Sequence, residues 1–287
     1  MSLQRSLVLV IALGFSHAAV AGQILAPGDV DLSQVVATRD VDYIAGVEYQ
    51  DDKDRLDIFM PEGADGVPVI VFFHGGGLSE GTKIDGEALA ARFVPAGIGV
   101  VSANYRLTPR VMHPAHVDDA AAAVAWVSRN IESYGGDPAK VYVSGHSAGA
   151  YLAVLLALDQ AHLTLHSLDS RAIRGAILIS PFLYVEETAP DRPKDVWGED
   201  PADWMRASVT PHIGPGKGQM LLVYADGDEE WRKEQNERFA SDMRAAGSPN
   251  VTAVQVSNRD HISLISKLND QNDEIRDAVL HFIKMAR

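Results

Sequence analysis

The sequence contains no cysteine among its 287 residues. Disulfide bonds are therefore excluded, and the fold has to be stabilised by a packed core. Positive charge is also scarce, because 25 lysine and arginine residues face 39 aspartate and glutamate residues, which gives a net charge of −14. A chain this acidic disfavours nucleic acids and anionic membrane surfaces as partners.

The chain also lacks linkers rich in proline, serine and glycine, repeats at a fixed period, and low-complexity tracts. Hydrophobic residues make up 46% and charged residues 22% of the sequence, which is the balance of an ordinary globular protein. A chain of this length can bury one large core. We therefore expect a single main domain.

Apolar runs long enough to cross a bilayer are absent. Residues 6–15 are nearly all apolar and follow Arg5, and Ala19-Val20-Ala21 has the small-x-small pattern that signal peptidases accept. A membrane-spanning helix needs about 20 apolar residues, so this run is too short for an anchor. We expect residues 1–21 to be a cleaved signal peptide and residues 22–287 to form the mature domain. This predicts a periplasmic or secreted protein without stable membrane insertion.

Short apolar runs alternate with helical patterns along the rest of the chain. The first two expected strands have no helix between them, which favours an antiparallel start. The later strands, several of them apolar throughout, alternate with helices, which is typical of a parallel sheet covered on both faces. The expected fold class is α/β, with a mostly parallel, doubly wound sheet. The expected strands are Ile44–Gln50, Arg55–Met60, Pro68–Phe73, Ile98–Asn104, Val141–Gly145, Ala176–Ser180, Met220–Ala225 and Val251–Val256, and the expected helices are Asp85–Phe93, Ala115–Asn130, Ala148–Asp159, Glu230–Ala246 and Asp273–Met285.

A segment of about 39 residues, 181–219, separates two of the expected strands. This length is uncommon for a connection without secondary structure. One interpretation is a small cap over a site, and the other is a surface excursion whose aromatic side chains pack into the main core. We favour a cap-like insertion. Its aromatic residues are Phe182, Tyr184, Trp197 and Trp204.

The pattern G-x-S-x-G occurs twice, at Gly145–Gly149 and at Gly77–Gly81. A nucleophile elbow requires a strand, a sharp turn at the serine and then a helix. Ser147 follows "KVYVSG", which is typical of a buried strand, and precedes "AGAYLAVLLALD", which is typical of a helix. Ser79 is followed by "EGTKIDG", which does not begin a helix. We therefore predict that Ser147 is a nucleophile and Ser79 an ordinary loop residue.

Backbone amides near this serine could stabilise an oxyanion. The amide of Ala148 lies in the first turn of the expected helix, where it has no partner within the helix. Three glycines follow His74 directly after the strand "PVIVFF", and glycines let bare N–H groups approach a reacting carbonyl. We predict Gly76, Gly77 and Ala148 as the oxyanion-hole donors. A flexible turn would also explain three glycines, but not their pairing with a serine elbow.

A serine hydroxyl needs a base to accept its proton, and the base needs an anion to fix its tautomer. Of the ten histidines, His261 lies five residues beyond the last expected strand, where this kind of sheet places the base. The preceding strand runs into Asp226-Gly-Asp228. A turn at Gly227 could point the next carboxylate inward, so we predict Asp228 rather than Asp226 as the acid.

Together these motifs make the sequence similar to the α/β-hydrolase fold. Within it, the sequence resembles the carboxylesterases related to hormone-sensitive lipase and the bacterial kynurenine-formamidase-like and feruloyl-esterase-like proteins. The chain order Ser147, Asp228, His261 is the order of this fold. The resembling segments are "HGGG" at 74–77, "NYRL" at 104–107, "HPAHVDDAAAAVAWV" at 113–127, "GGDPAKVYVSGHSAGAYLA" at 135–153 and "DH" at 260–261.

The resemblance implies ester or amide hydrolysis through a covalent acyl-serine, with no metal and no organic cofactor. It also implies a structural role for the pair Asp118 and Asp119. Two departures concern Ala150, where many relatives carry a further glycine, and "YADGDEEW" around the acid, which is not the usual sequence there.

The expected function is that of a serine carboxylesterase acting on a small-molecule ester. Two alternatives stay open. One is an arylformamidase or other amide hydrolase with the same triad, and the other is a non-catalytic binding module of the same fold.

Overall fold

The computed structural model describes residues 35–286, apart from 45, 47–48, 50, 189–190 and 271–272. The signal peptide predicted at residues 1–21 lies outside these residues, as does the beginning of the predicted mature domain. Everything below concerns the described part of the chain.

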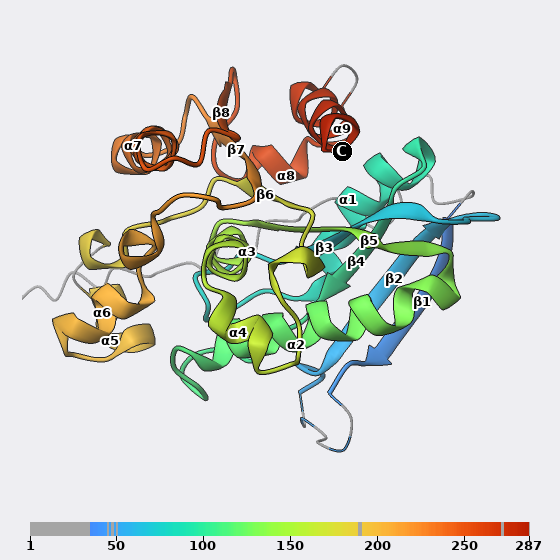
Figure 1. Ribbon diagram of the computed structural model, residues 1–287, viewed down its shortest axis with the longest axis horizontal. Coiled ribbons are helices and arrows are strands. Elements are labelled where there is room, and N and C mark those ends of the chain that lie inside the picture. Colours follow the sequence, from blue (N-terminus) through green and yellow to red (C-terminus); the bar gives the residue numbers. More distant parts are fainter. Residues whose placement is uncertain are drawn as a thin grey trace, which may run out of the picture.

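The described strands form one sheet in the order β1-β2-β4-β3-β5-β6-β7-β8, with helices on both faces (Figure 1). Neighbours from β4 through β3 to β8 are parallel, whereas β2 pairs antiparallel with both β1 and β4. This confirms the predicted α/β class with a mostly parallel sheet. The strands are β1 (Val35–Asp42), β2 (Arg55–Pro61), β3 (Val67–Phe73), β4 (Gly99–Ala103), β5 (Gly136–His146), β6 (Gly175–Ile179), β7 (Gln219–Ala225) and β8 (Val251–Val256).

The first strand corrects one expectation. It lies at Val35–Asp42, upstream of the predicted strand Ile44–Gln50, of which the described residues 44, 46 and 49 are in no strand. The antiparallel start is therefore formed by a different segment. The sequence of β1, "VVATRDVD", is only partly buried because this strand lies at the edge of the sheet, so it lacks the apolar run that marks the others.

The helices divide between the two faces of the sheet. In β3, Val69, Val71 and Phe73 pack into the core under α2, α3 and α7, while Ile70 and Phe72 pack into the core under α1, α8 and α9. Burial on both faces explains why β3 is apolar throughout. No helix of the described residues is both long and apolar enough to span a membrane. The helices are α1 (Gly86–Phe93), α2 (Ala115–Asn130), α3 (Ala148–Leu158), α4 (Gln160–Thr164), α5 (Asp191–Trp197), α6 (Pro201–Ala207), α7 (Glu230–Ala245), α8 (Ser263–Ser266) and α9 (Glu274–Met285).

The 181–219 segment carries α5 and α6 and is tied to α3 by aromatic side chains. The Trp197 indole donates to the Tyr151 hydroxyl at 3.1 Å, and this hydroxyl donates to the Ala207 carbonyl at 2.8 Å. Phe182 stacks on Tyr151 with 4.6 Å between ring centroids. All three aromatic residues are buried in the main core, in agreement with the second interpretation of this segment. A covering role for α5 and α6 stays a prediction.

The register of the parallel strands brings their carboxyl ends to one edge of the sheet. The loops after β3, β5, β6, β7 and β8 therefore meet at this edge, where open α/β sheets bind ligands. The pairs nearest the edge are Phe73 with Gly145, His146 with Ile179, Ile179 with Val223, and Ala225 with Val256.

Candidate active site

Ser147 occupies a sharp turn between β5, which ends at His146, and α3, which begins at Ala148. Its φ of +54° and ψ of −115° lie where a residue with a side chain is strained. The Ser147 N–H donates to the Ile179 carbonyl at 2.8 Å, which ties the turn to the end of β6. The segment thus has the strand, turn and helix of a nucleophile elbow.

The elbow requires glycine on both sides of the serine. A Cβ at Gly149 would lie 1.9 Å from the Phe73 carbonyl oxygen, and one at Gly145 would lie 2.2 Å from the carbonyl carbon of Gly149. Both distances are shorter than any real contact. Only glycine lets α3 begin so close to the end of β3.

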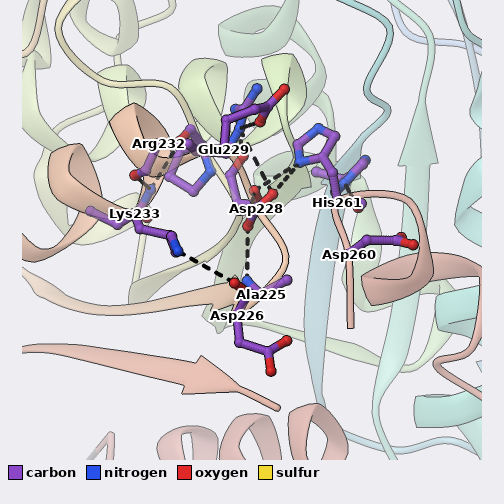
Figure 2. Close-up of polar contacts among 12 residues, drawn as sticks. Ala225, Asp226, Asp228, Glu229, Arg232, Lys233, Asp260 and His261 are labelled. Carbon is purple, nitrogen blue, oxygen red and sulfur yellow. Dashed lines mark hydrogen bonds and ion pairs between the residues drawn. The ribbon is translucent and has the colours of Figure 1, made fainter. Parts of the chain in front are cut away.

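Asp228 and His261 are hydrogen-bonded at the same edge, as Figure 2 shows, with 2.9 Å between Asp228 Oδ1 and His261 Nδ1. Asp228 Oδ2 accepts from the Ala225 N–H and from the Ser180 hydroxyl, each at 2.8 Å. Burial alone would raise the pKa of Asp228, but the hydrogen bonds from His261, Ala225 and Ser180 outweigh it and hold the pKa below its ordinary value.

These contacts determine the tautomer of His261. An ionised Asp228 can only accept hydrogen bonds, so His261 Nδ1 must carry the proton. The lone pair of Nε2 is then available to accept a proton from elsewhere. The pair has the arrangement that a general base and its orienting carboxylate require.

Asp226 points away from His261 (Figure 2). Its carboxylate accepts from the backbone N–H groups of Asn258 and Arg259 at 2.9 and 3.1 Å, and these bonds lower its pKa. Asp226 therefore holds the loop after β8, whereas Asp228 contacts the imidazole.

His146, the residue before Ser147, links the elbow to His261. Its Nε2 lies 2.8 Å from the His261 carbonyl oxygen, and the two rings lie 4.6 Å apart between centroids. Burial lowers the pKa of His146 to about 3, and the neighbouring His261 adds to the shift. The ring is therefore neutral, and Nε2 donates, because a carbonyl oxygen can only accept.

Ser147 and His261 are neighbours through these links without being hydrogen-bonded to each other among the described residues. Hydrogen bonds between a nucleophile and its base are often long without substrate. The structure thus brings the predicted nucleophile and base to the same edge of the sheet.

The glycine loop after β3 lies against the elbow. A Cβ on Gly75 would lie 3.5 Å from the Cβ of Ser147. Gly76 and Gly77 have φ of +102° and +63°, and within the described chain no group accepts a hydrogen bond from either amide. Ala148 is the first residue of α3, so its amide has no partner within the helix. Within the described residues, the three N–H groups therefore have no hydrogen-bond acceptor, as oxyanion donors require.

The buried pair His74 and Tyr105 supports this loop. The two rings stack with 4.3 Å between centroids, and the Tyr105 hydroxyl donates to the His74 carbonyl at 2.9 Å. Burial lowers the pKa of His74 to about 3, so its neutral ring donates through Nδ1 to the Gly75 carbonyl at 2.7 Å. These bonds hold the start of the glycine loop.

Comparison with known proteins supports the same fold. The family model BD-FAE matches residues 56–190. Carboxylesterase NlhH of Mycobacterium tuberculosis (strain CDC 1551 / Oshkosh) is 43% identical over 94 residues, which are 32% of this chain and 30% of NlhH. Esterase LipQ of M. tuberculosis (strain ATCC 25618 / H37Rv) is 28% identical over 224 residues, which are 72% of this chain and 53% of LipQ.

A solved structure extends the likeness over nearly the whole chain. Thermogutta terrifontis esterase 2, phosphonylated by cyclosarin, has a TM-score of 0.67 and 26% identity, and the match covers 87% of this chain and 91% of that one. The chain has the α/β-hydrolase fold. Its relatives carry the names carboxylesterase and esterase, which confirms the resemblance expected from the motifs. The chain spans about a third to a half of the length of these two M. tuberculosis relatives.

Asp119 has contacts that fit the structural role implied by the resemblance. Arg106, from the "NYRL" motif, donates to the two oxygens of Asp119 at 2.8 and 2.7 Å. This bidentate pair ties the loop after β4 to α2. Within the described chain, no three histidine or carboxylate side chains are grouped so that they could hold a metal ion.

Sequence reasoning missed Ser180. It directly follows β6, and its hydroxyl contacts both Asp228 and His261. Ser180 belongs to no recognisable sequence motif. The one signal that could have indicated it was its position at the carboxyl end of an expected parallel strand.

Proposed function

We propose that this hydrolase cleaves small carboxylic esters through an acyl-serine intermediate. The observation that carries the proposal is the hydrogen bond from His261 Nδ1 to the buried Asp228, formed beside the strained elbow of Ser147. The names of the relatives, carboxylesterase and esterase, support the same reaction class.

In the first half of the reaction, Ser147 Oγ attacks the ester carbonyl carbon while His261 Nε2 takes the hydroxyl proton. The N–H groups of Gly76, Gly77 and Ala148 donate to the oxyanion, and each such donor typically contributes about 2.7–4 kcal/mol to lowering the barrier. The tetrahedral intermediate collapses as the C–O bond breaks, and protonated His261 gives its proton to the leaving alcohol.

In the second half, water attacks the acyl-serine and His261 again accepts the proton. The carboxylic acid leaves and the Ser147 hydroxyl is restored. Asp228 stays ionised throughout, because its role is to hold the tautomer and to stabilise the imidazolium.

The test has two measurements on the full protein. A fluorophosphonate probe should label Ser147 in the folded protein and not after unfolding, and p-nitrophenyl acetate should be hydrolysed with multiple turnovers. The phosphonylated T. terrifontis esterase 2 supports this choice of probe. A folded protein that is neither labelled nor active would instead support the non-catalytic binding module.

The bond that is cleaved is tested separately by comparing p-nitrophenyl acetate with N-formylkynurenine. We expect the higher kcat/KM with the ester. Faster turnover of the formamide would retain the triad and change the substrate class to arylformamides. Esters of graded chain length would then define the acyl group.

We also propose that the chain is exported and cleaved after Ala21. The basis is the Ala19-Val20-Ala21 pattern behind a short apolar run. N-terminal sequencing of the protein from a periplasmic or culture fraction should begin at Gly22, and a chain that retains Met1 there would contradict the proposal.

A further inference from the structure

Ser180 bridges the acid and the base from a third loop. Its Oγ lies 2.8 Å from Asp228 Oδ2 and 2.9 Å from His261 Nδ1. The residue is completely buried and has a φ of +48°, a left-handed value that is costly for a residue other than glycine. The fold therefore maintains a strained serine at the position where it meets both groups.

The proton positions of this cluster follow from its partners. The carboxylate of Asp228 only accepts, so the single hydroxyl proton of Ser180 points to Asp228 Oδ2. The lone pairs of Ser180 Oγ are then left to face His261 Nδ1–H. The nitrogen atom His261 Nδ1 lies 2.9 Å from each of two acceptors, Asp228 Oδ1 and Ser180 Oγ. These acceptors come from the loops after β7 and β6.

The backbone around Ser180 is anchored on both sides. The Ser180 N–H donates to the Val223 carbonyl of β7 at 2.7 Å, and Arg232 Nη1 donates to the Ser180 carbonyl at 3.1 Å. Asn236 of α7 donates to the Pro181 carbonyl at 3.1 Å. The hydroxyl is therefore held in place independently of His261, and it can orient the ring rather than follow it.

We propose that Ser180 is a positioning residue that fixes the rotation of the His261 ring and stabilises the proton on Nδ1 when the ring becomes charged. This inference rests on the proposed esterase function for its kinetic consequence. A second acceptor matters most in the transition state, where the imidazole gains a proton, so its loss should lower kcat and leave KM nearly unchanged.

The experiment compares Ser180→Ala with Ser144→Ala. Ser144 is a matched control, because it is also completely buried, lies on the neighbouring strand β5, and has a hydroxyl without a hydrogen-bond partner. Hydrogen bonds to charged groups predict a loss of about 10- to 100-fold in kcat for Ser180→Ala, with KM changed by less than about 2-fold. The control should retain kcat within about 2-fold.

A second variant and a second measurement keep the test decisive. Ser180→Gly removes the same hydroxyl and relieves the positive φ, so it serves if Ser180→Ala does not fold. The far-downfield proton resonance of His261 Nδ1–H, which needs no substrate, should shift in either Ser180 variant and not in Ser144→Ala. A wild-type protein inactive on esters would refute the proposed function alone. An unshifted resonance, a kcat equal to that of the control, or a change confined to KM would each refute the role of Ser180.

Discussion

The two G-x-S-x-G segments of this protein have the same pattern and different structures. At Gly145–Gly149 a parallel strand enters, Ser147 turns sharply, and α3 leaves. At Gly77–Gly81 the serine lies in an exposed turn, where the Ser79 hydroxyl donates to the Gly76 carbonyl at 3.2 Å.

The difference shows that the five-residue pattern G-x-S-x-G does not by itself identify a nucleophile. Both segments begin at the carboxyl edge of the sheet, but only Ser147 lies beside a histidine that is hydrogen-bonded to a buried carboxylate. Gly77 of the other segment follows directly on Gly75 and Gly76, and Gly75 is the residue of this loop that lies against Ser147. The first segment has the geometry of a nucleophile elbow, and the second is part of the glycine loop beside it.

The largest expected effect separates the two serines. Ser147→Ala should lower kcat by about 10⁶-fold, the order found when a triad serine is removed, because no other hydroxyl occupies the elbow. Ser79→Ala should change kcat by less than about 2-fold, since its hydroxyl only closes an exposed turn. The measurement is kcat for p-nitrophenyl acetate hydrolysis by both variants. A large loss of kcat in Ser79→Ala alone would assign the nucleophile to Ser79.

The next effect tests whether the partners of the elbow are correctly identified. Asp228→Asn should lower kcat by about 10⁴-fold, because an amide no longer holds the proton on His261 Nδ1. Asp226→Asn is the matched control and should retain most activity, since this carboxylate bonds only backbone N–H groups of the next loop. Similar losses in both variants would contradict the assignment of the acid.

A smaller effect concerns the packing of the elbow. Gly149→Ala should lower the free energy of unfolding by about 1–3 kcal/mol, because the added methyl group overlaps the Phe73 carbonyl oxygen. Gly218→Ala, where a Cβ meets nothing within 4 Å, should stay within about 0.5 kcal/mol of wild type. Urea unfolding measures both, and a Gly149→Ala protein as stable as wild type would contradict the close approach of α3 to β3.

The smallest effect concerns the second position of each pattern, where the elbow has His146 and the turn has Leu78. The pKa of His146 is lowered from about 6.5 to about 3 in the folded protein, so the unfolded chain binds more protons between these values. The buried, neutral His146 therefore lowers the free energy of unfolding more and more as pH falls below about 6.5.

Replacing His146 by glutamine removes this titration and retains a donor for the His261 carbonyl. The variant should therefore lose stability less steeply between pH 6 and 4, by about 1.4 kcal/mol per pH unit. Urea unfolding across this range gives the slope, to which the buried His74 contributes equally in both proteins. An unchanged slope would show that His146 is protonated in the folded state.

Most of the fold could be predicted from the sequence, because strands buried on both faces are apolar throughout. β3 and β7 were recognisable for this reason, whereas β1 is an edge strand with exposed, polar positions and was placed too late in the chain. Short-range patterns likewise located the elbow at Ser147 and the loop that carries His261.

The composition and order of residues by themselves determined that this chain forms a helix-covered parallel sheet with a serine turn at its edge. The tertiary structure alone decided that the Ser180 hydroxyl contacts both Asp228 and His261, which lie 48 and 81 residues further along the chain. The physical reason is that periodicity acts between near neighbours, whereas a hydrogen bond depends on strand register and on loops that meet only after the sheet has formed.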